Sequence, residues 1–213
     1  MTSSKTATQN NYDRLSRWYD LIASSERKYK QAGLEMLAVQ KEETILEVGF
    51  GTGWGLLELA KSVGDAGHVS GVDISAGMYN VAEAKIARAG YSNRVDIRIG
   101  DAAELPYEAN TFDGIFSSFT LELFSTPEIP VVLAECKRVL RPGGRLCVVS
   151  LNKKEQDSLM VRMYEWTHKA FPHVVDCRPI FIQQAIEDAG FKIADRAEMS
   201  MWGLPVLALV AGK

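Results

Sequence analysis

One stretch decides the fold of this 213-residue chain: Ile45-Leu46-Glu47-Val48-Gly49-Phe50-Gly51-Thr52-Gly53-Trp54-Gly55. It starts as a short apolar strand and continues into a turn in which every second residue is glycine. Glycines at this density cost chain entropy, so backbone geometry is their best explanation: positive φ, or close approach to another group. A turn of this kind at the carboxyl end of a strand is where open α/β sheets bind nucleotide-like ligands.

The spacing of the glycines narrows the class of ligand. A dinucleotide-binding fingerprint, Gly-x-Gly-x-x-Gly, that began at Gly49 would place its third glycine at position 54, which is Trp54. Beginning at Gly51 or Gly53 does not restore the pattern. A P-loop is excluded because no Gly-Lys-Ser/Thr follows. An acidic residue, Glu47, instead stands two positions before the first glycine.

Length and composition indicate a single soluble globular domain. Hydrophobic residues make up 46% of the chain and charged residues 24%, which sets aside the disordered and fibrous classes. The formal net charge of -3 gives no general attraction to nucleic acid. The cysteines, at 136, 147 and 177, are widely spaced and form no CxxC pair, which argues against a disulfide framework or a zinc site and fits a reducing compartment. With no secretory segment and no apolar run near the roughly 20 residues of a membrane span, we expect a cytoplasmic protein.

Apolar periodicity divides the chain into alternating helices and strands. Residues 1–10 lack periodicity and are expected to form a disordered tail, which leaves residues 11–213 as one domain. Helices are expected near 15–22, 29–37, 54–63, 76–89, 126–140, 159–171 and 179–189, and strands at 44–50, 68–74, 95–100, 112–119, 145–150, 191–199 and 204–211. This alternation predicts a mostly parallel sheet with helices on both faces, and the last two strands predict an antiparallel end.

Acidic residues stand at the ends of the second and third expected strands. Asp73 lies about 20 residues past the glycines, where a carboxylate can accept hydrogen bonds from both hydroxyls of a ribose. Asp101 is followed by Ala102, and a carboxylate beside a backbone amide could read an adenine edge. Each acid also has a structural alternative: Asp73 as an exposed strand end, Asp101 as a cap of the next turn and Glu47 as a partner within the glycine turn.

The order of these features resembles one family. The glycine turn, Asp73 and Asp101 are followed by Phe112-Asp113-Gly114-Ile115 in the fourth strand and Arg141-Pro142-Gly143-Gly144 before the fifth. In this order they resemble the class I S-adenosylmethionine-dependent methyltransferases, from about Tyr12 to the end of the chain. The resemblance implies a single-domain, Rossmann-like α/β fold with a seven-stranded, mostly parallel sheet of order 3-2-1-4-5-7-6, helices on both faces and N-terminal lid helices.

The resemblance also implies where the cofactor, S-adenosyl-L-methionine, binds, and no metal is expected. The implied residues are Tyr12 and Tyr19 as a lid; Glu47, Gly49, Gly51 and Gly53 at the methionine part; Asp73 at the ribose; Ile74, Met78, Asp101 and Ala102 around the adenine; and Ser117 and Ser118 at the methyl-donor end.

No catalytic dyad stands out. The candidate catalytic residues are Glu122, after the fourth strand, and His168, in the aromatic-rich helix 159–171. Glu122 occupies a position where many relatives carry histidine, and a surface or capping role is the alternative for His168. Because the methyl group of the cofactor is already activated, aligning a nucleophile and excluding water would carry most of the reaction. The absence of a strong base therefore fits methyl transfer.

A narrower resemblance concerns the acceptor. The opening from Asn11-Tyr12-Asp13 to Trp18-Tyr19-Asp20 and the segment Leu105-Pro106-Tyr107 are similar to the ubiquinone/menaquinone-biosynthesis branch. We therefore expect C-methylation of a quinone precursor or another lipophilic or aromatic small molecule, with transient membrane-surface contact and no nucleic-acid partner. Phospholipid (phosphatidylethanolamine) N-methylation is the alternative. Two alternatives are not methyltransferases. One is a nicotinamide-dependent oxidoreductase, against which the glycine spacing argues, and the other is a non-catalytic cofactor-binding protein.

Overall fold

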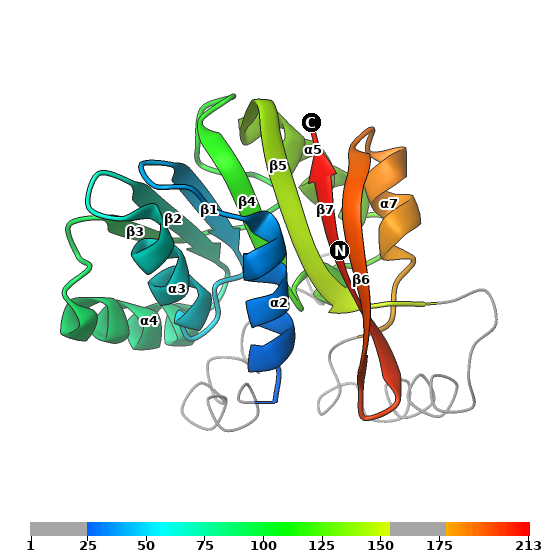
Figure 1. Cartoon of the computed structure of the whole chain (residues 1–213), viewed down its shortest axis with the longest axis horizontal. Coiled ribbons are helices and arrows are strands. Elements are labelled where there is room, and N and C mark those ends of the chain that lie inside the picture. Colours follow the sequence, from blue (N-terminus) through cyan, green and yellow to red (C-terminus); the bar gives the residue numbers. More distant parts are fainter. Residues whose placement is uncertain (1–24, 154–177) are drawn as a thin grey trace.

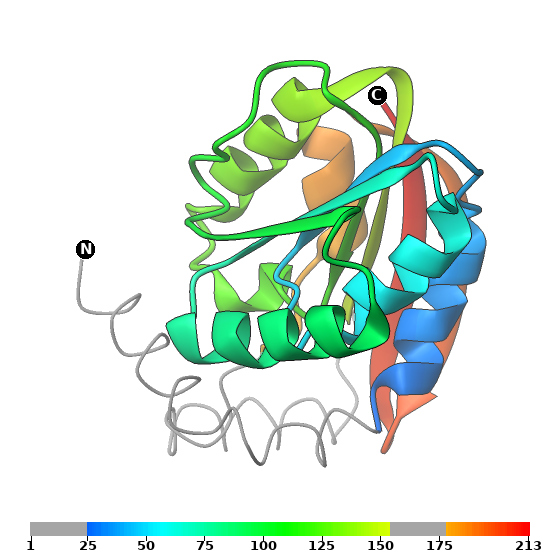
Figure 2. The same ribbon diagram turned by 90° about the vertical axis from the view of Figure 1, so that its left-hand side faces the viewer.

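The computed structural model describes residues 25–153 and 178–213 of the chain. These residues form one seven-stranded sheet with helices packed on both of its faces (Figures 1 and 2). The strands are β1 (Thr44–Val48), β2 (His68–Asp73), β3 (Val95–Ile99), β4 (Phe112–Ser118), β5 (Leu140–Leu151), β6 (Lys192–Met201) and β7 (Leu204–Gly212). The helices are α2 (Arg27–Leu37), α3 (Trp54–Val63), α4 (Ala76–Ala89), η1 (Leu121–Leu123), α5 (Ile129–Val139) and α7 (Ile182–Asp188).

The strand order confirms the predicted topology. The strands lie in the order β3-β2-β1-β4-β5-β7-β6. Strands β1 to β5 are parallel, whereas β7 runs antiparallel to both β5 and β6. The chain moves outward from β1 to β3 in one direction and from β4 to β5 in the other. The switch point between β1 and β4 is where open α/β sheets leave a crevice at the carboxyl ends of their strands.

Two hydrophobic cores lie on opposite faces of the sheet. On one face, α2, α3 and α4 bury residues such as Leu37, Leu59 and Ile86. On the other, α5 and α7 bury residues such as Leu133 and Ile186. Figure 2 shows the two layers of helices on either side of the strands. Because both faces are covered, the central strands are apolar over most of their length and do not alternate with polar residues.

Helix α2 is fixed to the sheet at both of its ends. At its C-terminal end, the guanidinium of Arg145 in β5 donates a hydrogen bond to the carbonyl of Leu37. Near its N-terminal end, Tyr29 Oη donates to the carbonyl of Ser200 in β6, at 2.6 Å. The helix therefore has a set position relative to the carboxyl ends of the strands.

Two predicted boundaries at the centre of the chain are wrong. Helix α5 begins at Ile129 and not at 126, because residues 126–128 form a turn. Strand β5 begins at Leu140, which pairs with Phe112 of β4. The segment 141–144, expected to separate helix from strand, therefore lies inside the strand.

The predicted helix after Pro179 also begins later, at Ile182. Ile180 forms a parallel bridge with Asn152 at the end of β5, which keeps residues 178–181 out of the helix. The tail at 1–10, the helix at 15–22 and the helix at 159–171 lie outside the described residues.

The close packing of α2 gives a stability prediction. A Cβ at Gly33 would lie 2.4 Å from Val149 Cγ2 and 3.1 Å from Phe116. Gly33→Leu should lower the free energy of unfolding by about 2 kcal/mol or more, because added methylenes in a tightly packed contact force side chains and backbone to shift. Urea denaturation measures the change. Gln31→Leu, on the exposed side of the same helix, is the matched control and should stay within about 0.5 kcal/mol of the wild type; equal effects of both substitutions would contradict the close approach.

Candidate functional site

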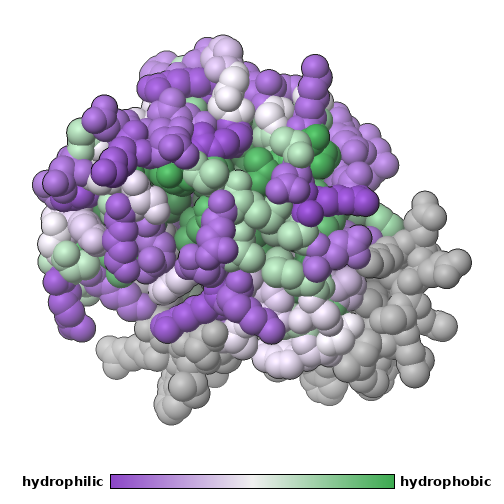
Figure 3. Space-filling view, viewed as in Figure 1, coloured by the Kyte–Doolittle hydropathy of each residue, from purple (hydrophilic) through white to green (hydrophobic). Residues whose placement is uncertain are grey.

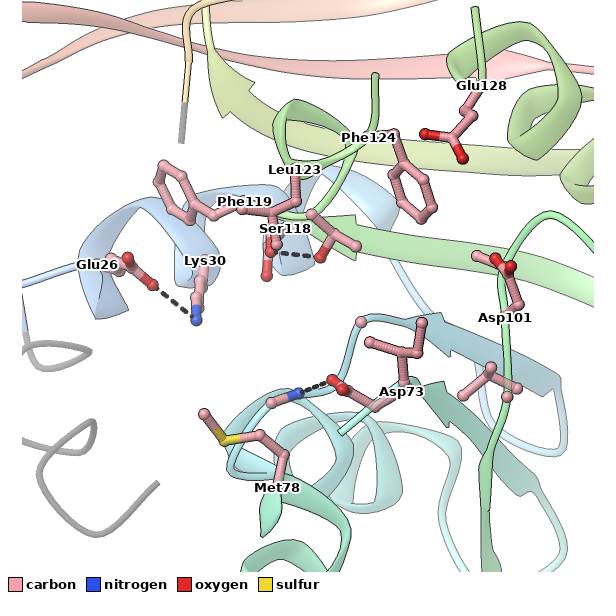
Figure 4. Close-up of a pocket in the computed structure, with 17 residues that line it drawn as sticks. Glu26, Lys30, Asp73, Met78, Asp101, Ser118, Phe119, Leu123, Phe124 and Glu128 are labelled. Carbon is pink, nitrogen blue, oxygen red and sulfur yellow. Dashed lines mark hydrogen bonds and ion pairs between the residues drawn. The ribbon is translucent and has the colours of Figure 1, made fainter. Parts of the chain in front are cut away.

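A cavity opens at the carboxyl ends of β1 to β4 and encloses about 930 Å³ of empty space, part of it open to solvent (Figure 4). Eight of the residues predicted to bind the cofactor line it: Gly49, Gly51, Asp73, Ile74, Met78, Asp101, Ala102 and Ser118. The sequence analysis did not identify nine others: Glu26, Lys30, Val72, Gly100, Phe119, Thr120, Leu123, Phe124 and Glu128.

The turn after β1 has backbone geometry that glycine adopts readily and other residues do not. The φ angles of Gly49, Gly51 and Gly53 are 75°, 51° and 81°. Gly49 also lies against Thr120, whose Oγ1 would be 2.2 Å from an added Cβ. At Gly51 an added Cβ would meet nothing within 4 Å, so the turn presents open backbone to the cavity.

Asp73 holds this turn in place from the tip of β2. Its Oδ2 accepts a hydrogen bond from the backbone N–H of Gly51 at 2.8 Å, and its Oδ1 accepts one from Ser75 at 2.9 Å. In Figure 4 the side chain points into the middle of the cavity.

A second acid, Asp101, faces the cavity from the turn after β3 (Figure 4). Its Oδ1 accepts a hydrogen bond from the backbone of Ala103 at 3.0 Å, so it also stabilises the turn, as the structural alternative proposed. Ile74 and Met78 add apolar surface to the same cavity. The hydroxyl of Ser75 accepts a hydrogen bond from the Met78 N–H and caps α4, which fixes where Met78 lies.

Helix α2 contributes an ion pair. Lys30 Nζ lies 2.9 Å from the carboxylate of Glu26, one helical turn away, and both side chains are largely buried. Figure 4 shows the pair on the opposite side of the cavity from Asp101. An acid and a base four residues apart are visible in the sequence, but this spacing is common on solvated helix faces. The position of α2 on the sheet is what brings the pair to the cavity.

The segment after β4 forms an apolar wall from Phe119, Leu123 and Phe124. Phe119 has a φ of 51°, which is uncommon for a bulky residue and occurs more often at functional sites. Its backbone N–H donates to the carbonyl of Val149 in β5 at 2.8 Å. Arg178 donates to the carbonyl of Phe124 at 2.8 Å. The wall is thus held by hydrogen bonds at both ends.

Glu122, predicted as a catalytic residue, anchors this wall from behind and does not line the cavity. Its Oε1 accepts a hydrogen bond from the backbone of Leu151 at 3.1 Å, and its Oε2 accepts one from Ser150 Oγ at 3.0 Å. The side chain is 1% exposed, and burial raises the pKa of its carboxyl to about 7 although these hydrogen bonds oppose the shift. The geometry is that of a positioning residue; a direct part in catalysis stays a prediction.

Three predicted cofactor residues lie near the cavity without lining it. Glu47 is buried under the first turn of α3, where an added Cβ at Gly55 would lie 2.2 Å from its Oε1, and burial raises the pKa of its carboxyl to about 8. Gly53, besides its positive φ, lies against Ala82 of α4, 2.8 Å from an added Cβ, so helix packing is a second reason for glycine at this position. Ser117 is buried within β4.

The predicted residues Tyr12, Tyr19 and His168 lie outside the described residues. Within residues 25–153 and 178–213, no group of three or more His, Cys, Asp or Glu side chains could hold a metal ion. No helix in this part of the chain is long and apolar enough to cross a membrane.

Known proteins share this sequence pattern and fold. A family model described as a methyltransferase domain matches residues 45–144. A demethylmenaquinone methyltransferase of Bacillus pumilus is 29% identical over 209 residues, which cover 84% of this chain and 88% of that protein. One from Listeria monocytogenes is 34% identical over 126 residues, 59% of this chain and 52% of that protein. The crystal structure of a SAM dependent methyltransferase from Aquifex aeolicus has a TM-score of 0.64 and 25% identity, covering 85% of this chain and 88% of that one.

The strand order, the family model and the Aquifex structure agree on the class of protein. Together with the similarity to the Bacillus relative, they support a class I S-adenosylmethionine-dependent methyltransferase. The relatives named as demethylmenaquinone methyltransferases also confirm the resemblance of this methyltransferase to the menaquinone branch. The chain spans about half the length of the Listeria relative.

The buried carboxyl of Glu122 predicts a pH dependence of stability in this methyltransferase. Its pKa rises from 4.5 to about 7 on folding, so between these values the folded state binds more protons than the unfolded state and stability falls as pH rises. Glu122→Gln has no such titration. Relative to this variant, the wild type should lose roughly 1–3 kcal/mol of unfolding free energy between about pH 5 and pH 8.

Chemical denaturation across this pH range measures the difference. Glu104→Gln, at an exposed position, is the matched control and should follow the wild type at every pH. Curves for wild type and Glu122→Gln that stay parallel from pH 5 to pH 8 would show that Glu122 does not titrate as described.

Proposed function

We propose that this methyltransferase binds S-adenosyl-L-methionine in the cavity and transfers its methyl group to a carbon atom of a quinone precursor. The observation that carries the proposal is the division of one cavity into two parts. Asp73 and Asp101 give it acceptors suited to a nucleoside, and Phe119, Leu123 and Phe124 give it an apolar wall suited to a lipophilic ring. The Bacillus and Listeria relatives, both demethylmenaquinone methyltransferases by name, point to the same kind of acceptor.

The described residues fit this cofactor. We assign the ribose hydroxyls to the Asp73 carboxylate and the adenine edge to Asp101 with the neighbouring Ala102. The open backbone at Gly51 accommodates the methionine part, because no side chain lies within 4 Å of its added Cβ. Lys30 lines the same cavity and would pair with the carboxylate of the methionine part.

The cofactor, when bound, supplies a methyl group already activated on a sulfonium. The chain's own part is then to hold the acceptor in line with that carbon at about 3 Å and to exclude water. Phe119, Leu123 and Phe124 would do both, since they desolvate an aromatic ring and fix its plane. The phenolic hydroxyl of a hydroquinone is acidic, and its ionisation makes the neighbouring ring carbon nucleophilic. Only modest help with proton removal is then needed, so a buried Glu122 that holds the wall is consistent with this chemistry.

A quinone precursor is insoluble in water, so its enzyme must meet it at a bilayer. We therefore propose a cytoplasmic protein with transient contact to the membrane surface. Cys136 and Cys147 are both free and buried, which supports a reducing compartment.

The role of Asp73 gives a binding prediction. Asp73→Ala should weaken binding of S-adenosylhomocysteine by roughly 1–3 kcal/mol, because the ribose hydroxyls would lose their buried acceptor and the glycine turn its anchor. Isothermal titration calorimetry measures the affinity. Asp96→Ala, whose carboxylate pairs with Arg98 on the protein surface, is the matched control and should bind as the wild type does. If Asp73→Ala bound S-adenosylhomocysteine as tightly as the wild type does, the assignment of the ribose hydroxyls to Asp73 would be wrong.

The acceptor is tested directly with isotope-labelled cofactor. The purified enzyme is incubated with a bacterial lipid extract and labelled S-adenosylmethionine, and mass spectrometry locates the label. We expect labelled menaquinone formed from its demethylated precursor. Label in phosphatidylethanolamine derivatives would support the N-methylation alternative. Tight NAD binding without S-adenosylhomocysteine binding would overturn the cofactor assignment itself.

A further inference from the structure

The hairpin between β6 and β7 carries a large aromatic residue at its tip. Trp202 is 69% exposed and forms, with Gly203, the two residues of the turn. Both have positive φ, 51° and 84°, the geometry of a turn that favours asparagine followed by glycine. Folding of the hairpin therefore does not explain a tryptophan here. Its exposure and its positive φ together make Trp202 a candidate for contact with something outside the chain.

A second exposed aromatic lies close to the tip of this hairpin. The backbone N–H of Asn152 donates to the carbonyl of Pro205, one residue into β7, at 2.8 Å. Its neighbour Lys153 has its ammonium 5.9 Å from the ring centre of Phe181, which is 49% exposed. The end of β5 thus places an aromatic ring and a cation beside the hairpin.

The other neighbour of the hairpin is the start of α2. Tyr29 of α2 joins the two elements, because its hydroxyl donates a 2.6 Å hydrogen bond to the carbonyl of Ser200. Ser200 lies two residues before Trp202. Arg27 and Lys28, the two residues before Tyr29, are exposed, and the first turn of α2 holds no acidic residue. The ammonium of Lys28 lies 4.7 Å from the ring centre of Tyr29, which keeps the positive charge near the hairpin.

We propose that Arg27, Lys28, Lys153, Phe181 and Trp202, the docking edge, bind the surface of an anionic lipid bilayer. Tryptophan prefers the interfacial layer of a membrane, and lysine and arginine are attracted by anionic headgroups. The chain as a whole carries a net charge of -3, so the attraction must be local, and the start of α2 supplies such a local charge. In Figure 3 the surface over the β6–β7 hairpin is pale.

The docking edge adjoins the entrance of the cavity. Glu26 and Lys30, which line the cavity, belong to the same turn of α2 as the exposed Arg27 and Lys28. In Figure 1 the hairpin tip and the start of α2 both lie at the lower edge, where the parallel strands end. A protein docked by this edge would turn its cavity toward the bilayer. This use of the surface rests on the proposed function, in which the acceptor is dissolved in the membrane.

The test is co-sedimentation of the full chain with vesicles that contain no methyl acceptor. We expect binding to phosphatidylglycerol/phosphatidylcholine vesicles, weaker binding as salt rises, and little binding to phosphatidylcholine alone. Arg27→Glu with Lys28→Glu should weaken binding by about tenfold or more. The matched control, Lys41→Glu with Lys192→Glu, makes the same change of charge at exposed positions on the opposite edge and should bind nearly as the wild type does.

Trp202→Asn separates bilayer contact from folding. Asparagine before Gly203 is the favoured turn sequence, so the hairpin should be at least as stable, as thermal melting would show. Binding to the vesicles should nevertheless fall severalfold. Val131→Ala, at an exposed apolar residue of α5, should leave it unchanged.

Three results would overturn the proposal: no binding of the wild type to anionic vesicles, equal binding of wild type and Trp202→Asn, or equal losses in the charge-reversed pair and its control. A Trp202→Asn variant that alters the oligomeric state in analytical ultracentrifugation and leaves vesicle binding intact would assign the surface to a second copy instead. Because the vesicles carry no acceptor, these results are independent of whether a quinone precursor is methylated.

Discussion

The hydrogen bond from the backbone of Gly51 to the Asp73 carboxylate joins the ends of two neighbouring strands at the site. It lies beside the crevice at the switch point between β1 and β4, and it sets the shape of the turn on which a ligand would lie. The same carboxylate also accepts a hydrogen bond from the backbone N–H of Ser75, whose side chain caps α4. One side chain therefore fixes a turn, the start of a helix and an acceptor in the cavity, so none of these can move independently of the others.

The parts of the fold that follow from local pattern could be predicted from the sequence. The strand at 44–48, its glycine turn and the acid at 73 need only hydrophobic runs, positive φ and a strand end. Element boundaries that depend on residues far away in the sequence could not be predicted. Leu140 is in a strand because Phe112 lies beside it, and residues 178–181 are extended because of a bridge between Ile180 and the end of β5.

The same distinction separates the site residues that were predicted from those that were missed. Asp73 and Asp101 follow strand ends, so their positions at the cavity are visible in sequence order. Glu26 and Lys30 reach it only because Gly33 lets α2 lie close to the sheet, a contact made with Val149 far along the chain. Glu122 was correctly placed after β4, but its direction, toward β5, depends on Ser150 and Leu151.

The apolar wall is built from one short segment, residues 119–124, which is attached to the fold at a few points. The carbonyl of Val149, the Glu122 carboxylate and the Arg178 guanidinium hold the segment from Phe119 to Phe124, whereas the nucleoside acceptors belong to other strands. The side chains of such a segment can be exchanged without changing the rest of the fold. Exchanging its side chains while keeping its anchors would reshape the acceptor half of the cavity and leave the cofactor half intact, which makes it the place to redesign the substrate range of this scaffold.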